Sequence, residues 1–276
     1  MVANLLKPLS NGSSIPNNFS IYSIWNTKTW SGLSNFSGNS IWKDGDNIYY
    51  SYDGTNYVLN KSTGTWNPKT WYGLTSFNGS RVWTDGDNIY YSYTNSGEQY
   101  VLDKATSTWS KKTWTGLTGF SGDSIWTDGT NTYYSNGSTY VLDKSTSTWS
   151  AKTWNGYNNI SGEYIWTDGI YIYYSNYSNQ YILNKYTSTW SPKSWNNQPS
   201  NYFIGSEIWT DGDNIYLSFS SSQYILDKST STWNIKKWNN IGDSYNKGEC
   251  VWTDGVNTYL SNNNYQYILI KYYILN

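Results

Sequence analysis

The chain has 276 residues, with 18 basic and 19 acidic side chains and a net charge of −1. All of the basic residues except Arg81 are Lys. This balance argues against a nucleic-acid partner, because recognition of many phosphates requires a basic face and Arg side chains. The lack of His and the single Cys, Cys250, rule out internal disulfides and remove the usual groups of zinc sites and His-based triads.

Two other protein classes are disfavoured by the sequence. No apolar run approaches the roughly 18 residues of a membrane span, so we expect no membrane insertion. The first residues lack a basic segment followed by a long apolar core, so no secretory signal is predicted. Asn, Ser, Thr and Tyr are abundant while Ala, Arg and Pro are scarce, a bias that hints at a low-GC bacterium or its phage.

In chain order, residues 1–20 come first and lie outside the repeated part of the sequence. They are polar and contain turn-forming runs of Asn, Gly, Ser and Pro. We predict that they form an N-terminal arm or tether. The remaining residues, 21–276, are predicted to form one domain.

A ten-residue segment at 41–50, with the sequence IWKDGDNIYY, recurs six times at intervals of about 40 residues. Its Trp falls at Trp42, Trp83, Trp126, Trp166, Trp209 and Trp252. Each repeat holds four short segments rich in Tyr, Trp, Val, Ile and Thr, which suit β-strands. The Asp-Gly pair between the first two segments is typical of a tight hairpin turn. The pattern therefore predicts an all-β fold, a six-bladed β-propeller of four-stranded blades.

Two further Trp series accompany the first. One comprises Trp25, Trp66, Trp109, Trp149, Trp190 and Trp233, and the other comprises Trp30, Trp71, Trp114, Trp154, Trp195 and Trp238. Because every repeat contains all three, we expect most of these side chains to pack between neighbouring blades.

The two ends of the chain predict how the ring closes. Residues 24–30, which include Trp25 and Trp30, match a fourth strand but have no preceding strands of their own. The last repeat ends at Asn276, where its own fourth strand would begin. We predict that the N-terminal strand completes the last blade and thereby removes an open sheet edge.

The segment Tyr100-Val101-Leu102-Asp103-Lys104 followed by Thr108-Trp109 resembles the kelch repeat, which has a Tyr, an acidic residue and a Trp in the last two strands of each blade. Residues 85–91 are similar to the first kelch hairpin. The resemblance extends from Ile24 to Asn276 but lacks the usual Gly-Gly pair after the second strand. A divergent family of phage or bacterial surface propellers fits equally well. Kelch-type propellers are mostly binding modules, so the resemblance implies a binding role.

Loop length varies after the second strand and before the first strand of the next blade, and we expect these loops to share one face. Variable loops on one face of a repeat array often form the binding face. Mixtures of aromatic and amide side chains suit ligand binding. The candidate ligand-binding residues are Trp71, Tyr72, Tyr93, Tyr157, Asn158, Asn196, Asn197, Tyr202, Glu207 and Tyr245.

The acidic residues suggest two other possible functions. The Asp of each Asp-Gly pair could suggest a catalytic or Ca²⁺ site, but the turn alone accounts for it, and we predict no metal and no cofactor. Glu163, Glu207 and Glu249 precede the Asp-Gly Trp in three consecutive repeats. Because glycoside hydrolysis needs only two carboxylates, they leave a glycosidase open as an alternative.

Together these features predict a non-catalytic binding module. We expect an attachment protein at a virion or extracellular surface that recognises a glycan or a protein receptor. The alternative from another class is a structural component that docks to neighbouring subunits of a phage-like assembly and binds no ligand.

Overall fold

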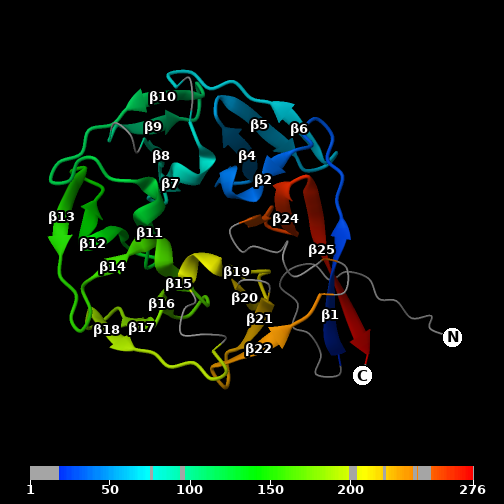
Figure 1. Ribbon diagram of the computed structural model, residues 1–276. Helices are drawn as coiled ribbons and strands as arrows, with labels where there is room; N and C mark the ends of the chain where they lie inside the picture. The colour runs from blue at the N-terminus through cyan, green and yellow to red at the C-terminus, as the bar shows by residue number, and fades with distance from the viewer. Residues whose placement is uncertain are drawn as a thin grey trace.

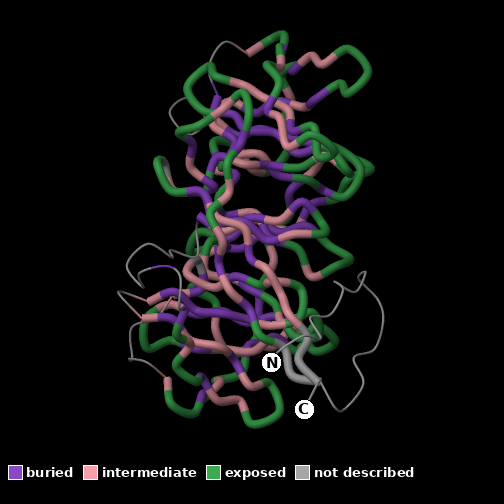
Figure 2. The backbone as a smooth tube through the Cα atoms, turned by 90° about the vertical axis from the view of Figure 1, so that its right-hand side faces the viewer, coloured by how far each residue is buried: buried purple, intermediate pink, exposed green. Residues whose placement is uncertain are grey.

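The computed structural model describes residues 19–74, 77–93, 97–198, 204–219, 222–238, 241 and 250–275. Six antiparallel sheets stand around a central axis as the blades of a β-propeller, as predicted (Figure 1). In each blade the first strand lies toward the centre and the fourth runs along the rim. Seen from the side, buried residues fill the layer between two exposed rims of loops and turns (Figure 2).

The strands follow the repeat closely. Blade one comprises β3 (Ile41–Asp44), β4 (Asn47–Tyr52), β5 (Thr55–Asn60) and β6 (Thr65–Pro68). Blade two comprises β7 (Val82–Thr84), β8 (Ile89–Ser92), β9 (Gln99–Asp103) and β10 (Thr108–Lys111). Blade three comprises β11 (Ile125–Thr127), β12 (Thr132–Asp143) and β13 (Thr148–Lys152). In this blade β12 spans the positions of the second and third strands of the other blades.

The remaining blades continue the pattern. Blade four comprises β15 (Ile165–Thr167), β16 (Ile172–Asn176), β17 (Asn179–Asn184) and β18 (Thr189–Pro192). Blade five comprises β19 (Ile208–Thr210), β20 (Ile215–Phe219), β21 (Ser222–Asp227) and β22 (Thr232–Lys236). Blade six comprises β23 (Val251–Thr253), β24 (Thr258–Asn263), β25 (Tyr265–Leu275) and β1 (Phe19–Thr27).

The sixth blade confirms the predicted closure. Strand β1 pairs antiparallel with β25 along its whole length, from Phe19 opposite Leu275 to Thr27 opposite Tyr267. The closing strand thus begins before residue 24 and ends at Thr27, whereas we expected it over residues 24–30. Trp30 lies beyond the strand, because the chain there turns toward the next blade and the indole packs against blade one.

In five of the six connections, a short 3₁₀ element that the structure describes leads from the rim strand to the next inner strand. These elements are η1 (Gly38–Ser40), η2 (Gly79–Arg81), η3 (Gly122–Ser124), η4 (Gly162–Tyr164) and η5 (Gly205–Glu207), with β2 (Phe36–Ser37) and β14 (Ile160–Ser161) before η1 and η4. Neighbouring 3₁₀ turns pack closely. A Cβ on Gly162 would lie 2.1 Å from the Ser124 carbonyl oxygen, so only Gly fits at this joint.

The core is a set of Trp triads between adjacent blades, as predicted from the three series. At the joint of blades two and three, the Trp83 ring centroid lies 5.8 Å from that of Trp114 and 6.1 Å from that of Trp149. The first-series indoles also form a buried hydrogen bond, as Trp83 Nε1 donates to Ser92 Oγ at 2.9 Å. The same bond occurs in every blade, which explains the Ser that follows each Tyr-Tyr or Tyr-Leu pair.

Candidate binding surface

Five of the six Asp-Gly carboxylates are occupied within their own turns. Asp128 Oδ1 accepts hydrogen bonds from the Thr130 and Asn131 backbone N–H groups, and its Oδ2 accepts one from the Tyr133 hydroxyl. Burial works to raise the pKa of Asp128, but these hydrogen bonds outweigh it and hold the pKa below its usual value. Asp85, Asp168, Asp211 and Asp254 make the same bonds. The turn therefore accounts for these carboxylates.

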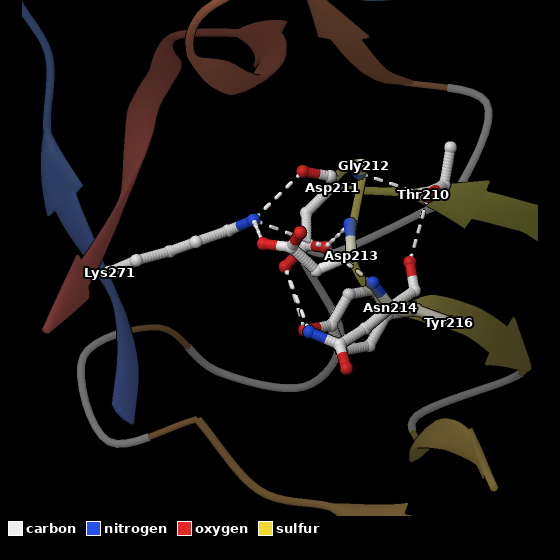
Figure 3. A network of polar contacts seen from close by, with 7 residues as sticks. All are labelled: Thr210, Asp211, Gly212, Asp213, Asn214, Tyr216 and Lys271. Atoms are coloured by element: carbon white, nitrogen blue, oxygen red, sulfur yellow. Dashed lines mark hydrogen bonds and ion pairs between the residues drawn. The ribbon is translucent and has the colours of Figure 1, made fainter. Parts of the chain in front are cut away.

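Six lysines connect each blade to the Asp-Gly turn of the preceding blade. At the joint of blades five and six, Lys271 Nζ donates to the Asp211 carbonyl at 2.9 Å and to Asp213 Oδ2 at 2.6 Å (Figure 3). The equivalent lysines are Lys61, Lys104, Lys144, Lys185 and Lys228. We name these six residues the lysine ring, and it runs unbroken through the closing joint, where Lys61 reaches the Asp254 carbonyl.

A second lysine set lies over the third Trp series. Lys152 Nζ lies 4.9 Å from the centroid of the Trp154 ring and donates to Ser188 Oγ of the next blade at 2.9 Å. Lys28, Lys69, Lys112, Lys193 and Lys236 lie over their Trp rings in the same way. Most of the basic charge of the chain therefore serves the joints between blades.

The structure defines two faces. The turn face carries the Asp-Gly turns and the turns between third and fourth strands, which meet through the lysine ring. The loop face carries the loops between second and third strands and the approach to each 3₁₀ turn. The sequence predicted that the loops leading to the first strand of the next blade open on the loop face. In the five connections that the structure describes, the start of the loop lies instead against the rim strand of the next blade. Tyr72, for example, accepts a hydrogen bond at its carbonyl from Trp109 N at 2.8 Å.

The predicted ligand-binding residues therefore divide into several groups. Trp71 is buried in the joint of blades one and two, so its ring is not open to a surface ligand. Tyr72, Asn196 and Asn197 are exposed but lie at the rim, where Tyr72 and Asn196 form backbone bridges to the next blade. Tyr93 is half-buried against Tyr91, with ring centroids 6.1 Å apart.

The other candidates lie on the loop face or outside the described residues. Tyr157 is half-buried, and the neighbouring Asn158 is exposed and accepts a hydrogen bond from Trp154 N through Oδ1. Glu207 is half-buried in η5. Tyr202 and Tyr245 lie outside the described residues, and so does Glu249. Of the described candidates, Tyr157 belongs to an aromatic cluster and Asn158 follows it in the chain, whereas the others are dispersed.

That cluster gathers four tyrosines of blade four, namely Tyr157, Tyr164, Tyr174 and Tyr181, which we name the tyrosine cluster. The Tyr157 and Tyr181 rings stack with centroids 4.3 Å apart and planes 16° apart. The Tyr174 ring lies beneath them, 5.7 Å from Tyr157 and 6.4 Å from Tyr164. Burial raises the pKa of Tyr174 to about 12, so this phenol stays protonated near neutral pH.

Polar groups surround the tyrosine cluster. Asn176 Nδ2 donates to the Tyr174 hydroxyl at 3.1 Å, and the exposed side chains of Asn158 and Asn159 lie on the same connection as Tyr157. Glu163 is exposed beside Tyr164 and accepts a hydrogen bond from Ser161 Oγ at 3.4 Å. The surface thus combines flat aromatic rings with amide and carboxylate groups.

At the tip of the hairpin between β16 and β17, Tyr177 projects beside this surface. Its side chain is 53% exposed, and its φ of 55° is the left-handed conformation that bulky residues rarely adopt. Asp53 occupies the corresponding position in blade one, with φ 47°. Backbone strain of this kind concentrates at ligand-binding sites, because a function retains the unfavourable residue.

Sequence reasoning missed Tyr164, Tyr174, Tyr177 and Tyr181. Tyr174 and Tyr181 occupy positions that are Tyr in most repeats, so they carry no individual signal. A usable signal lay in comparing the repeats position by position. Leu33, Leu74 and Leu117 stand where blade four has Tyr157, and Ser40 and Ser124 stand where it has Tyr164.

A cavity of about 520 Å³ opens among the inner strands of blades six, one and two. It is lined by Trp42, Trp83 and Trp252, whose indole N–H groups each bond to a buried Ser, and by Lys43 and Asn39. Its walls are therefore mainly the repeated joints. The described residues hold no group of three or more Cys, Asp or Glu that could bind a metal ion.

Comparisons with known proteins support the fold alone. No family model matches the chain, and no curated protein matches it. Among solved structures, YjhT is similar over 87% of this chain and 95% of its own, with a TM-score of 0.59 and 11% identity. The extracellular domain of the hybrid two-component system BT3049 from B. thetaiotaomicron is similar over 83% of this chain and 33% of its own, with a TM-score of 0.52 and 14% identity. No helix among the described residues is long and apolar enough to cross a membrane. The chain is a six-bladed β-propeller whose blades are built from one sequence repeat.

Proposed function

We propose that this propeller is a non-catalytic attachment protein of a virion or cell surface that binds a glycan through the loop face of blade four. The observation that carries the proposal is the tyrosine cluster beside the strained, exposed Tyr177. The apolar faces of sugar rings pack on flat aromatic side chains. Amide N–H groups donate hydrogen bonds to sugar hydroxyls, and amide and carboxylate oxygens accept hydrogen bonds from them. A protein receptor at the same surface is the competing outcome.

A binding role fits the use of charged groups better than catalysis does. Five of the six Asp-Gly carboxylates serve their turns, and most lysines serve the joints between blades. Glu163 lies exposed at the edge of the tyrosine cluster, where its carboxylate can reach a bound ligand. We therefore assign Glu163 to ligand recognition.

The proposal is tested by a glycan array probed with the wild-type protein and a double variant, Tyr157→Leu with Tyr164→Ser. Both replacements restore residues that other blades carry at these positions, so the fold should be retained. We expect the wild-type protein to bind a defined set of glycans. The double variant should bind the same glycans with an affinity at least about 10-fold lower.

The control is Tyr52→Ala, which removes an exposed tyrosine, 52% accessible, from the loop face of blade one. It should leave binding unchanged. If the wild-type protein binds no glycan on the array, or if the wild type and the double variant bind the glycans equally well, there is no glycan site in blade four. If the wild type binds a protein receptor and the double variant does not, the surface is a site for a protein instead of a glycan.

A further inference from the structure

The turn face of blade four carries a second surface, which the glycan proposal does not use. A groove of about 510 Å³ lies between the Asp-Gly turn and the turn that follows β17. Three large side chains line it with high exposure, namely Ile170 at 72%, Tyr171 at 50% and Tyr186 at 99%. Ile182 and Leu183 form part of its lining. Exposed apolar side chains that share one groove are typical of an interaction site.

All three residues depart from the repeat. Blade three has Thr130, Asn131 and Ser145 at these positions. The remaining blades have Asp or Val at the first position and Asn at the second, and they have Ser or Ala at the third, except for Tyr272 in blade six. Blade four alone combines large side chains at all three positions.

The turn itself does not require these side chains. Asp168 Oδ1 accepts hydrogen bonds from the backbone N–H groups of Ile170 and Tyr171, as the equivalent Asp does elsewhere. In blade three Asn131 Nδ2 also donates to Asp128 Oδ2 at 3.3 Å, and a Tyr at position 171 cannot make that bond. Blade four thus replaces a local polar contact with exposed apolar surface.

Two lysines lie beside the groove without an ion pair to a described carboxylate. Lys185 and Lys228 donate to the backbone carbonyls of Asp128 and Asp168, at 3.0 Å and 3.2 Å. By contrast, Lys104, Lys144 and Lys271 of the lysine ring form ion pairs with carboxylates of the preceding blade. Within the described part of the chain, no carboxylate lies within ion-pair distance of Lys185 or Lys228. Both are exposed, so two ammonium groups that form no ion pair within the described part of the chain lie beside the groove.

Two polar groups at the groove already serve the turns. Asn184 Oδ1 accepts hydrogen bonds from the Tyr186 and Thr187 backbone N–H groups, and Asp168 accepts bonds within its own turn at both carboxylate oxygens. An apolar floor with positive charge at its edge matches a protein segment better than a glycan.

We propose that this groove docks a partner protein through an extended or loop segment in which an apolar side chain stands among Asp or Glu residues. The apolar side chain fills the space between Ile170, Tyr171 and Tyr186, and the carboxylates face Lys185 and Lys228. The surface lies on the opposite face from the tyrosine cluster, so glycan binding and docking can occur together.

The test uses an array of synthetic peptides of about ten residues, each with one Leu, Phe or Trp among Asp and Glu. Matched peptides replace the acids by Lys or the apolar residue by Ser. We expect the full-length protein to retain the acidic apolar peptides, and higher salt to weaken this binding. A triple variant, Ile170→Asp, Tyr171→Asn and Tyr186→Ser, should bind them about 10-fold more weakly or worse.

The triple variant carries residues that other blades hold at the same positions, so its far-UV circular dichroism and melting temperature should match the wild type. The double variant of the tyrosine cluster should retain the peptides, which separates a failure of this proposal from a failure of glycan binding. The proposal would be overturned if the wild type bound the Lys-containing peptides as tightly as the acidic ones. It would also be overturned if the triple variant bound all peptides as tightly as the wild type does. Concentration-dependent dimerisation lost in the triple variant would also overturn it, by assigning the groove to a second copy of the chain.

Discussion

Replacing Tyr177 by Asn should make the protein more stable and its ligand binding weaker. Tyr177 has φ 55°, and an L-residue other than Gly, Asn or Asp loses about 1–2 kcal/mol in this conformation. Asn tolerates it through local hydrogen bonds of its side chain. Because the Tyr177 side chain is 53% exposed, its removal sacrifices little buried area. We expect a net gain of about 1 kcal/mol in the free energy of unfolding.

Urea denaturation measures that gain, and a rise of about 2–4 °C in melting temperature should accompany it in a domain of this size. Binding to the glycans retained by the wild type should fall about 10-fold. Asp53→Asn is the control, because Asp53 has φ 47° at the same turn position of blade one and is already a residue that tolerates it. Its stability should be unchanged. If Tyr177→Asn destabilises the protein or leaves binding intact, the strain at Tyr177 has no connection with function.

Three further predictions concern the joints and turns. Trp83→Phe and Ser92→Ala should show a coupling of about 1 kcal/mol in a double-mutant cycle of urea denaturation, because each removes one partner of a buried hydrogen bond. Gly162→Ala should cost about 3 kcal/mol, because its Cβ would meet the Ser124 carbonyl oxygen at 2.1 Å. Stability should fall steeply below about pH 4: the folded pKa of Asp128 lies below its unfolded value, so its contribution is present above that value and is lost as pH falls through the folded pKa.

Each of these has a control and a contrary outcome. Trp149→Phe with Ser92→Ala should show no coupling, since Trp149 Nε1 has no partner among the described atoms, and coupling there would refute the hydrogen-bond account. Gly119→Ala should cost only about 1 kcal/mol, because Gly119 has φ 71° but no atom near its Cβ position. The loss of stability in acid should be shallower in Asp128→Asn, and an unchanged pH profile would show that other groups cause it.

The architecture was predictable because the same pattern of strand and turn residues occurs in all six repeats. The Asp-Gly pair, the Trp series and the unpaired N-terminal strand each predict one element of a closed propeller, and the structure has all three. The role of Ser92 and its equivalents was less accessible, since a bond between residues nine apart depends on how β7 and β8 pair. The lysine ring was hidden too, because it joins residues of different repeats.

The candidate site was harder to predict than the fold. Variable loop length drew attention to Tyr72 and Asn196, but the rim strands run toward the next blade and hold their backbones in the joints. Trp71 follows the rule of its series and is buried. The two proposed surfaces rest instead on substitutions at constant length, such as Tyr157 for Leu or Ile170 for Asp. They change what the surface presents without changing the path of the chain.

The lysine ring has an evolutionary consequence. Every repeat offers a lysine toward the blade before it and an Asp-Gly turn toward the blade after it, so one unit carries both halves of the joint. A repeat that is copied or exchanged as a whole therefore brings with it the lysine and the turn that its neighbours need for these contacts. Point substitutions such as those in blade four can then alter what a single blade presents to a partner while the contacts between blades stay the same.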